Sequence, residues 1–173
     1  IIVSTLLTLF IYFFIELFFK IYYDYFSITE IINSFQMIII SNIISSNIIF
    51  IIAMFISSIT SFSTFETLYG VIIGFFTGVY IPIGYYPTII KNIFFFFPLT
   101  QTTSMLRQIN TNKITGNILN NYPKELHNIL YETFGIHLKF NSSIVTLNSQ
   151  FIFIFIIIIL LQILTFILIE YKS

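Results

Sequence analysis

Long apolar blocks separated by short polar segments dominate the chain. Four of them, at 1–19, 37–56, 68–83 and 151–169, approach or reach the length of a membrane span. Because a hydrocarbon core about 30 Å thick needs roughly 20 helical residues to cross, we interpret these blocks as transmembrane helices. A closed barrel is the other structure that satisfies its backbone in lipid. The last block is about twice as long as a barrel strand and lacks apolar–polar alternation, so helices are favoured.

The segment between the third and fourth blocks is too long for a simple hairpin and has two parts. Residues 85–109 are rich in Ile and Phe but are interrupted by Pro87 and Pro98. This piece has too few apolar residues in a row to cross, so we expect it to re-enter the membrane or to lie along its surface.

Residues 110–148 are rich in Asn, Lys and Thr, which predicts a polar insert in water. Within it, Pro123 fits a first helical turn and Gly135 is placed to end a short amphipathic helix. The predicted fold is therefore all-α: a polytopic helical membrane protein, one transmembrane domain over 1–173, with four transmembrane helices, a re-entrant helical hairpin and a small polar external insert.

Composition narrows the classes of function. The chain is 57% hydrophobic and 8% charged, whereas soluble domains carry about 25% charged residues. Seven basic and seven acidic residues leave no basic surface of the kind that binds nucleic acid. Cysteine is absent, which excludes disulfides, thiolate metal sites and cysteine nucleophiles from this sequence. Membrane lipid is the partner indicated. The opening residues are apolar with no basic segment before them, so we expect a piece of a longer protein rather than a secretory signal.

Small residues follow one face of two predicted helices. In the third block, Gly70, Gly74 and Gly78 recur every fourth residue, and Glu66 and Pro82 extend the row. Such a row predicts close helix packing, and Pro82 is expected to end or kink the helix. In the second block, Ser and Asn residues at 41, 42, 45 and 46 share an arc. Packing is the favoured interpretation of that arc, and a substrate-lining role is the alternative.

Few residues suggest enzymatic chemistry. The sequence contains no P-loop, no H-E-x-x-H, no G-x-S-x-G and no dinucleotide fingerprint, so we expect a non-enzyme that binds no cofactor. His127 and His137 lie in the polar insert near Glu125 and Glu132. They admit a metal site, although solvated histidines are the simpler interpretation.

Two carboxylates fall close to the predicted spans. Glu16 precedes Lys20 by four residues, which favours a local ion pair near the interface. Glu66 is expected just before the third span, in the headgroup zone. A role in a transport path is the alternative for both, because charges within spans often mark such paths.

One stretch resembles a known family. It comprises Gly-Val-Tyr-Ile-Pro-Ile-Gly-Tyr-Tyr-Pro at 78–87, Phe-Pro-Leu-Thr-Gln at 97–101 and Ser-Met-Leu-Arg-Gln at 104–108, with Arg107 near its end. These residues are similar to the turn, the second proline, the Pro-Leu-Thr and the arginine of type 2 ABC exporter permeases. Residues 57–65 also resemble the short link by which that family enters its penultimate span.

The resemblance implies a six-span subunit in the cell membrane, the plasma membrane of a bacterium, with both ends in the cytoplasm and the four spans seen here as the third to sixth. It also implies a second permease subunit and cytoplasmic ATPase subunits as partners. ATP hydrolysis on those subunits would move an amphipathic or drug-like cargo outward. A non-transporting membrane scaffold or assembly subunit is the alternative, because the glycine row and the polar insert suit static packing equally well.

Overall fold

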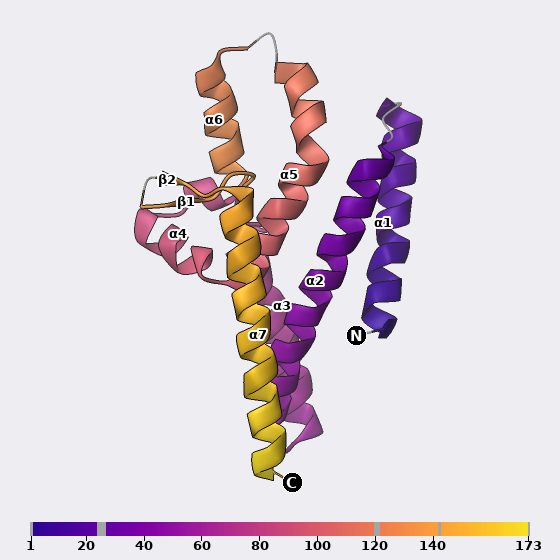
Figure 1. The fold of residues 1–173 in the computed structure, drawn as a ribbon, viewed down its shortest axis with the longest axis vertical. Coiled ribbons are helices and arrows are strands. Elements are labelled where there is room, and N and C mark those ends of the chain that lie inside the picture. Colours follow the sequence, from indigo (N-terminus) through magenta and orange to yellow (C-terminus); the bar gives the residue numbers. More distant parts are fainter. Residues whose placement is uncertain (1, 24–26, 120–121, 142, 173) are drawn as a thin grey trace.

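The structure, a computed structural model, describes residues 2–23, 27–119, 122–141 and 143–172 (Figure 1). Four of its helices are long and apolar enough to cross a membrane: α1 (Ile2–Tyr23), α2 (Ile28–Ala53), α3 (Ile59–Phe76) and α7 (Leu147–Lys172). The predicted all-α fold of a polytopic membrane protein with four transmembrane helices is confirmed.

The long helices carry many of their large apolar side chains on the outside. Phe13 on α1 is 62% exposed and Phe166 on α7 is 69% exposed, and many Ile, Leu and Phe side chains of these helices are similarly uncovered. Soluble proteins rarely expose continuous apolar surface of this kind. This exposed apolar surface is suited to contact with lipid, and the chain is membrane-embedded.

The helix ends differ from the predicted ends. α2 starts at Ile28 rather than at 37. Its first turns contain polar residues, but apolar residues recur among them at helical spacing, at 28, 31, 32 and 35. α3 starts at Ile59, directly after the extended backbone of Ser58. Residues 57–65, which we interpreted as a link, therefore lie almost entirely inside α3.

The third predicted span, 68–83, also ends too late, because α3 stops at Phe76. Gly78 takes a φ of +72°, and two hydrogen bonds close the helix end: Val79 N donates to Gly74 O at 2.9 Å, and Gly78 N donates to Phe75 O at 3.2 Å. This pairing is a Schellman motif, in which a glycine with positive φ follows the last helical residues. Pro82 was expected to end the helix, and the glycine ends it earlier.

After α3 come a short 3-10 helix, η1 (Ile83–Tyr85), then α4 (Thr88–Phe95) and α5 (Pro98–Leu119). α4 and α5 form the expected pair of helices, joined at residues 96–97. The division that we drew at residue 110, between a hairpin at 85–109 and a polar insert at 110–148, falls inside α5, which runs from Pro98 to Leu119 as one helix.

The chain then returns toward the bundle. It forms α6 (Lys124–Thr133) and a two-stranded antiparallel sheet of β1 (Lys139–Phe140) and β2 (Ser143–Ile144), followed by α7. In Figure 1 the far end of α5 and the start of α6 extend beyond the upper end of α7, on the same side of the molecule as the end of α1 and the start of α2.

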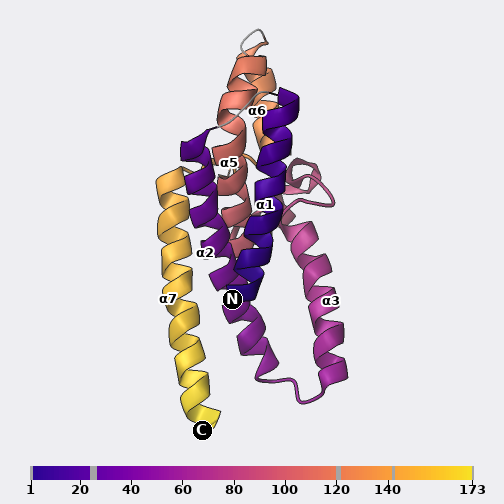
Figure 2. The same ribbon diagram turned by 90° about the vertical axis from the view of Figure 1, so that its right-hand side faces the viewer.

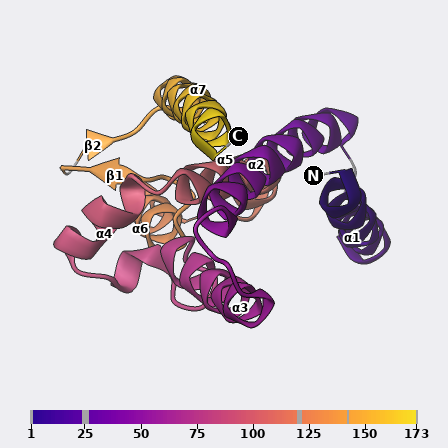
Figure 3. The same ribbon diagram turned by 90° about the horizontal axis from the view of Figure 1, so that it is seen from below.

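The core lies where α5 packs against α2 and α7 (Figure 3). Its buried apolar side chains come from these three helices: Met37, Ile44, Leu99, Met105 and Ile154. α1 lies at the edge against α2, and α3 stands apart from α7 on the other side (Figures 2 and 3). α5, the least apolar of the long helices, is thus the centre of the fold.

Candidate functional site

The residues that resemble the permease motif meet where two helices end. We call this region the glycine corner and define it by Gly78, Ile83, Arg107 and Gly135. α6 ends in a second Schellman motif: Gly135 has a φ of +64°, Ile136 N donates to Tyr131 O at 2.8 Å, and Gly135 N donates to Glu132 O at 3.2 Å. The predicted end of this helix at Gly135 is confirmed.

Ile83 fills the space between the two glycines. A Cβ on Gly78 would lie 2.6 Å from Ile83 Cγ1, and a Cβ on Gly135 would lie 2.8 Å from Ile83 Cδ1. The neighbouring Gly84 lies even closer to its surroundings, because a Cβ there would be 2.4 Å from Thr133 Cα. Real side chains do not tolerate such contacts, so η1 and α6 can pack this closely only while residue 84 is glycine.

Arg107 connects α5 to this corner. Its Nη2 donates to Gly78 O at 3.3 Å, which satisfies a carbonyl at the end of α3. Its Nη1 is buried without a hydrogen-bond partner and lies 3.1 Å from the position that a Cβ on Gly135 would take. Ser104, one turn earlier, donates to Ile136 O at 2.9 Å. Through these two side chains α5 is hydrogen-bonded to the end of α3 and to the end of α6.

The three prolines of the motif each start a helix. Pro82 precedes η1, Pro87 precedes α4, and Pro98 is the first residue of α5. Their fixed φ suits a first helical turn, and the missing N–H is not needed there. The motif residues thus determine where helices begin and end in this region.

The glycine row does not form one flat strip. Gly78 and Pro82 lie beyond α3, and a Cβ on Gly70 would meet nothing within 4 Å. Gly74 is buried, but the group above it is the ring of Tyr80 from the same chain segment, 2.2 Å from the position of a Cβ. Within the described residues, Gly74 accommodates a turn and not a neighbouring helix.

α5 buries an unusual number of polar side chains: Thr100, Gln101, Thr102, Ser104 and Gln108. Gln108 Nε2 donates to Gln150 Oε1 on α7 at 3.2 Å, and Thr100 donates to Phe76 O at 2.9 Å. In an apolar bundle such bonds fix one arrangement of helices, since a displaced partner would leave a buried polar atom unpaired. On α2, Asn42 donates to Thr8 of α1 at 3.0 Å, in line with the packing interpretation of the polar arc.

The polar insert shows no metal site among the residues that the structure describes. His127, His137 and the neighbouring glutamates do not come together as a group of three ligands. Glu132 pairs instead with Lys139 at 2.5 Å. The ring of His137 packs against Tyr131 with centroids 4.9 Å apart, and burial lowers the pKa of His137 from its usual 6.5.

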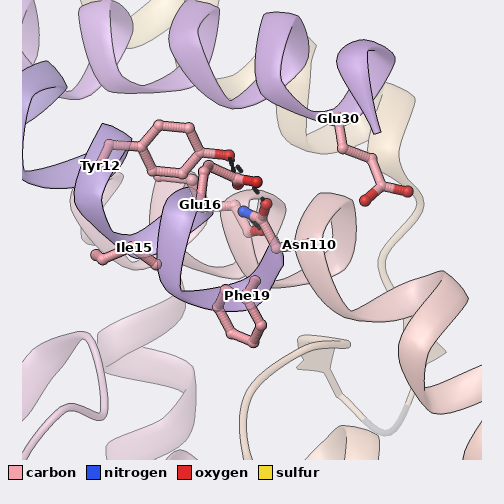
Figure 4. A pocket seen from close by; sticks show the side chains of 7 residues that line it. Tyr12, Ile15, Glu16, Phe19, Glu30 and Asn110 are labelled. Carbon is pink, nitrogen blue, oxygen red and sulfur yellow. Dashed lines mark hydrogen bonds between the residues drawn. The ribbon is translucent and has the colours of Figure 1, made fainter. Parts of the chain in front are cut away.

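A largely apolar pocket that also contains carboxylates, and that the sequence analysis missed, lies between α1, α2 and α5 (Figure 4). It has a volume of about 250 Å³. Its lining residues are Tyr12, Ile15, Glu16, Phe19, Glu30, Leu106 and Asn110. The Tyr12 hydroxyl donates to the Glu16 carboxylate and lies 3.2 Å from Asn110 Oδ1. We call this the α1–α2–α5 pocket.

In this pocket Glu16 accepts a hydrogen bond from the Tyr12 hydroxyl, a partner that the sequence analysis did not predict. Ser34 of α2 donates to Asn110 Oδ1 at 3.2 Å, and Asn110 Nδ2 donates to Leu106 O at 2.9 Å, so the amide is held from both sides. One signal was present in the sequence, because Glu16 is a carboxylate inside an apolar helix. Its hydrogen-bond donor, Tyr12, lies on the same helix. Asn110 of α5 and Ser34 of α2, which meet beside Tyr12, carry no signal that links them to α1.

Glu66 also lies elsewhere than expected. It is an exposed residue in the interior of α3 and does not precede that helix. Around it, Ser63, Thr64 and Thr67 are exposed as well. Thr64 and Thr67 donate to the backbone oxygens of Thr60 and Ser63, at 3.0 and 3.1 Å, so their hydroxyls are satisfied within α3. A carboxylate cannot be satisfied in that way.

Comparisons with known proteins identify no relative: no protein-family model, no curated protein and no solved structure matches the chain.

Proposed function

We propose that this chain belongs to the permease subunit of an ATP-binding-cassette exporter, a multi-pass protein of the cell membrane that moves an amphipathic or drug-like cargo outward. The observation that carries the proposal is the exposed polar face of α3, with Glu66 in the interior of a helix that is long enough to span. A second line of support is the resemblance of residues 78–108 to permeases of this kind.

The polar face of α3 is unsuited to lipid. A charged side chain near the middle of a span costs roughly 2.5–3.5 kcal/mol or more, and such residues face a protein partner or a water-filled cavity. α3 is the least hydropathic of the four candidate spans, and its lower part lies away from the rest of the bundle (Figure 2). In the proposed assembly this face lines the path of the cargo, together with a second permease subunit.

The α4–α5 pair supports the same proposal. In the permease family two short helices re-enter the membrane between the last two spans. Here α4 and α5 also come between α3 and α7 in the chain, although α5, with 22 residues, is not short. The polar first half of α5 packs among the long helices. Energy would come from cytoplasmic ATPase subunits, since this sequence contains no P-loop.

Co-purification tests the partner directly. The full-length protein, extracted in mild detergent from its own cells, is expected to bring down a protein with a G-x-x-x-x-G-K-[ST] motif whose ATPase turnover depends on the membrane subunit. Recovery of the full-length protein without any ATPase would contradict the proposal.

Thiol accessibility separates an exporter from a static scaffold. The sequence described here has no cysteine, so Ser63→Cys introduces one thiol on the polar face of α3. In an exporter this thiol reacts with a water-soluble maleimide, because the face meets water during the cycle. In a scaffold it is covered permanently and stays unreacted. Phe166→Cys on α7, 69% exposed in the structure, is the lipid-facing control and should not react.

A further inference from the structure

A small pocket beside the glycine corner has a positively charged lining. We call it the lysine pocket, and its lining residues are Ile83, Lys91, Glu132, His137, Leu138 and Lys139. Glu132 pairs with Lys139, whereas the side chain of Lys91 has no hydrogen bond or ion pair within the part of the chain that the structure describes. Burial lowers the pKa of His137 from 6.5, so its ring is neutral at neutral pH. One positive charge in the lining is therefore not neutralised by a described carboxylate.

The wider surroundings of the lysine pocket are also basic. Arg107 lies behind Ile83, since its Nη1 and Ile83 Cδ1 are 3.1 and 2.8 Å from the position of a Cβ on Gly135. Of the seven basic and seven acidic residues, those between α3 and α7 are Lys91, Arg107, Lys113, Lys124 and Lys139 against Glu125 and Glu132. α1 and the start of α2, which carry other carboxylates, lie at the opposite edge of the bundle from α4 (Figure 3). This side of the molecule therefore favours an anion.

α4, which contributes Lys91, has one apolar face directed outward. Ile89, Ile93 and Phe96 follow one another at helical spacing and are 76%, 57% and 57% exposed. Lys91 lies about 200° around the helix axis from Ile89, on the opposite face. A helix with exposed apolar residues on one face and a lysine on the other is typical of a segment at a membrane surface.

α4 lies at the level where α7 begins. Phe95 of α4 packs against Phe153 with ring centroids 6.1 Å apart, and Phe153 is six residues, or roughly 9 Å, from the start of α7. The ring of Phe140 in β1 packs on Phe95 with centroids 4.9 Å apart, which holds Lys139 next to α4. In Figure 1 the strands and α6 lie above α4, on the side away from most of α7. The apolar face of α4 can therefore contact acyl chains while the lysine pocket lies among headgroups.

The size of the lysine pocket favours a lipid over a soluble ligand. Its volume is about 20 Å³, which is room for one water-sized group. Sites that enclose small molecules usually have volumes of roughly 300 Å³ or more. A phospholipid needs no such enclosure, because the membrane holds its acyl chains and only its phosphate oxygens must meet the protein. Lysine ammonium groups bind phosphate oxygens through short, charge-assisted hydrogen bonds.

From these observations we propose that the lysine pocket binds the phosphate of an anionic phospholipid, with Lys91 as its principal counter-charge and the apolar face of α4 against the acyl chains. Lys139 is a weaker contact, because its charge is shared with Glu132. The proposal does not depend on transport, since an exporter and a scaffold could both bind lipid in this way.

Equilibrium binding of phosphatidylglycerol with a fluorescent acyl chain to the full-length protein in an uncharged maltoside detergent tests the proposal. Phosphatidylcholine with the same labelled chain is the control lipid, and the wild-type protein should bind it less tightly. Lys91→Gln should weaken phosphatidylglycerol binding about fivefold, the effect of one lysine at an anionic surface, and Lys91→Arg should keep most of the affinity. Lys124→Gln removes the same charge from the exposed start of α6 and should leave binding unchanged.

Equal affinity of the wild type for the two lipids would overturn the proposal without the use of any variant. Equal phosphatidylglycerol binding by the wild type and Lys91→Gln would also overturn it, as would an equal loss in Lys124→Gln, which would indicate diffuse attraction. Glycerol phosphate, added at constant ionic strength, should not displace the lipid, and displacement would identify a site for soluble phosphate instead. No nucleotide or ATPase takes part, so a failed exporter assignment leaves this result intact, and a failed lipid result leaves the ATPase co-purification intact.

Discussion

The glycine corner and the α1–α2–α5 pocket are both anchored on α5, and they use polar atoms in opposite ways. In the corner, Arg107 and Ser104 donate to backbone oxygens at two helix ends, and glycines let the chain segments approach closely. In the pocket, polar side chains from three helices line a cavity of about 250 Å³. The polar atoms of the corner therefore fix helix ends, whereas those of the pocket border open space.

This difference shows what the family resemblance can support. The residues that carry it, from Gly78 to Arg107, start helices, end helices and hold η1 against α6. They argue for an architecture, whereas cargo must be argued from a site. Apart from Leu106, the residues that line the pocket lie outside the resembling stretch, so the resemblance gives no information about a ligand there.

The largest effect is expected in the corner. Gly84→Ala places a methyl group 2.4 Å from Thr133 Cα, so η1 and α6 must move apart. We expect a loss of about 1–3 kcal/mol in the free energy of unfolding, seen as a lower Tm in detergent. Gly70→Ala is the matched control, since a Cβ there meets nothing within 4 Å. Equal melting of both variants would show that the close contact is not formed.

A smaller effect is expected at the polar contact between α5 and α7. Gln108→Leu removes the donor to Gln150 and leaves a buried amide oxygen unpaired, at a cost of about 1–2 kcal/mol. The double variant Gln108→Leu with Gln150→Leu should recover part of this loss, because no unpaired amide remains. A double variant that melts at the sum of the two single losses would mean that the two side chains are independent.

The pocket should behave in the opposite way in the same assay. Glu16→Gln is expected to change the free energy of unfolding by less than about 0.5 kcal/mol, because the amide still accepts from Tyr12. A Tm that falls as far as in Gly84→Ala would make Glu16 a structural residue and remove the contrast between the two regions.

The smallest effect is a pH dependence beside the corner. Burial lowers the pKa of His137 in the fold from its usual 6.5, so the unfolded chain takes up the proton first as the pH falls. The stability that neutral His137 contributes is present above pH 6.5 and is lost as the pH drops below this value. Tm measured between pH 7.5 and 5 should decline less in His137→Phe than in the wild type; identical declines would exclude a contribution from His137.

The sequence predicted the four long helices because length and continuous hydrophobicity suffice for them. Their ends were predicted less well. α3 stops at Phe76 because Gly78 adopts a positive φ, while the sequence offered both a glycine and Pro82 as the terminator. α5 was divided at residue 109 because its composition changes there, although burial against α2 and α7 keeps it one helix.

The candidate site was only partly predictable. Glu16 was identified as a charge near a span, and its donor Tyr12 lies on the same helix. Tyr12 also meets Asn110 of α5, which accepts from Ser34 of α2, and only packing brings these three helices together. In the corner, Gly135 was predicted as a helix end, whereas Gly78 was placed by its spacing on a flat helix face and instead ends α3. In both regions the sequence lacked tertiary information: it does not say which helix ends lie next to each other or which side chains of different helices are in contact.

An ATP-dependent change in thiol accessibility on the polar face of α3 tests the central claim most directly. In membranes from cells that produce the full-length protein together with the proposed ATPase subunit, ATP is predicted to change the rate at which the thiol introduced by Ser63→Cys reacts with a water-soluble maleimide, while Phe166→Cys on the apolar surface of α7 stays unreactive. A rate that is the same with and without ATP, or a thiol at position 63 that never reacts, would contradict the account.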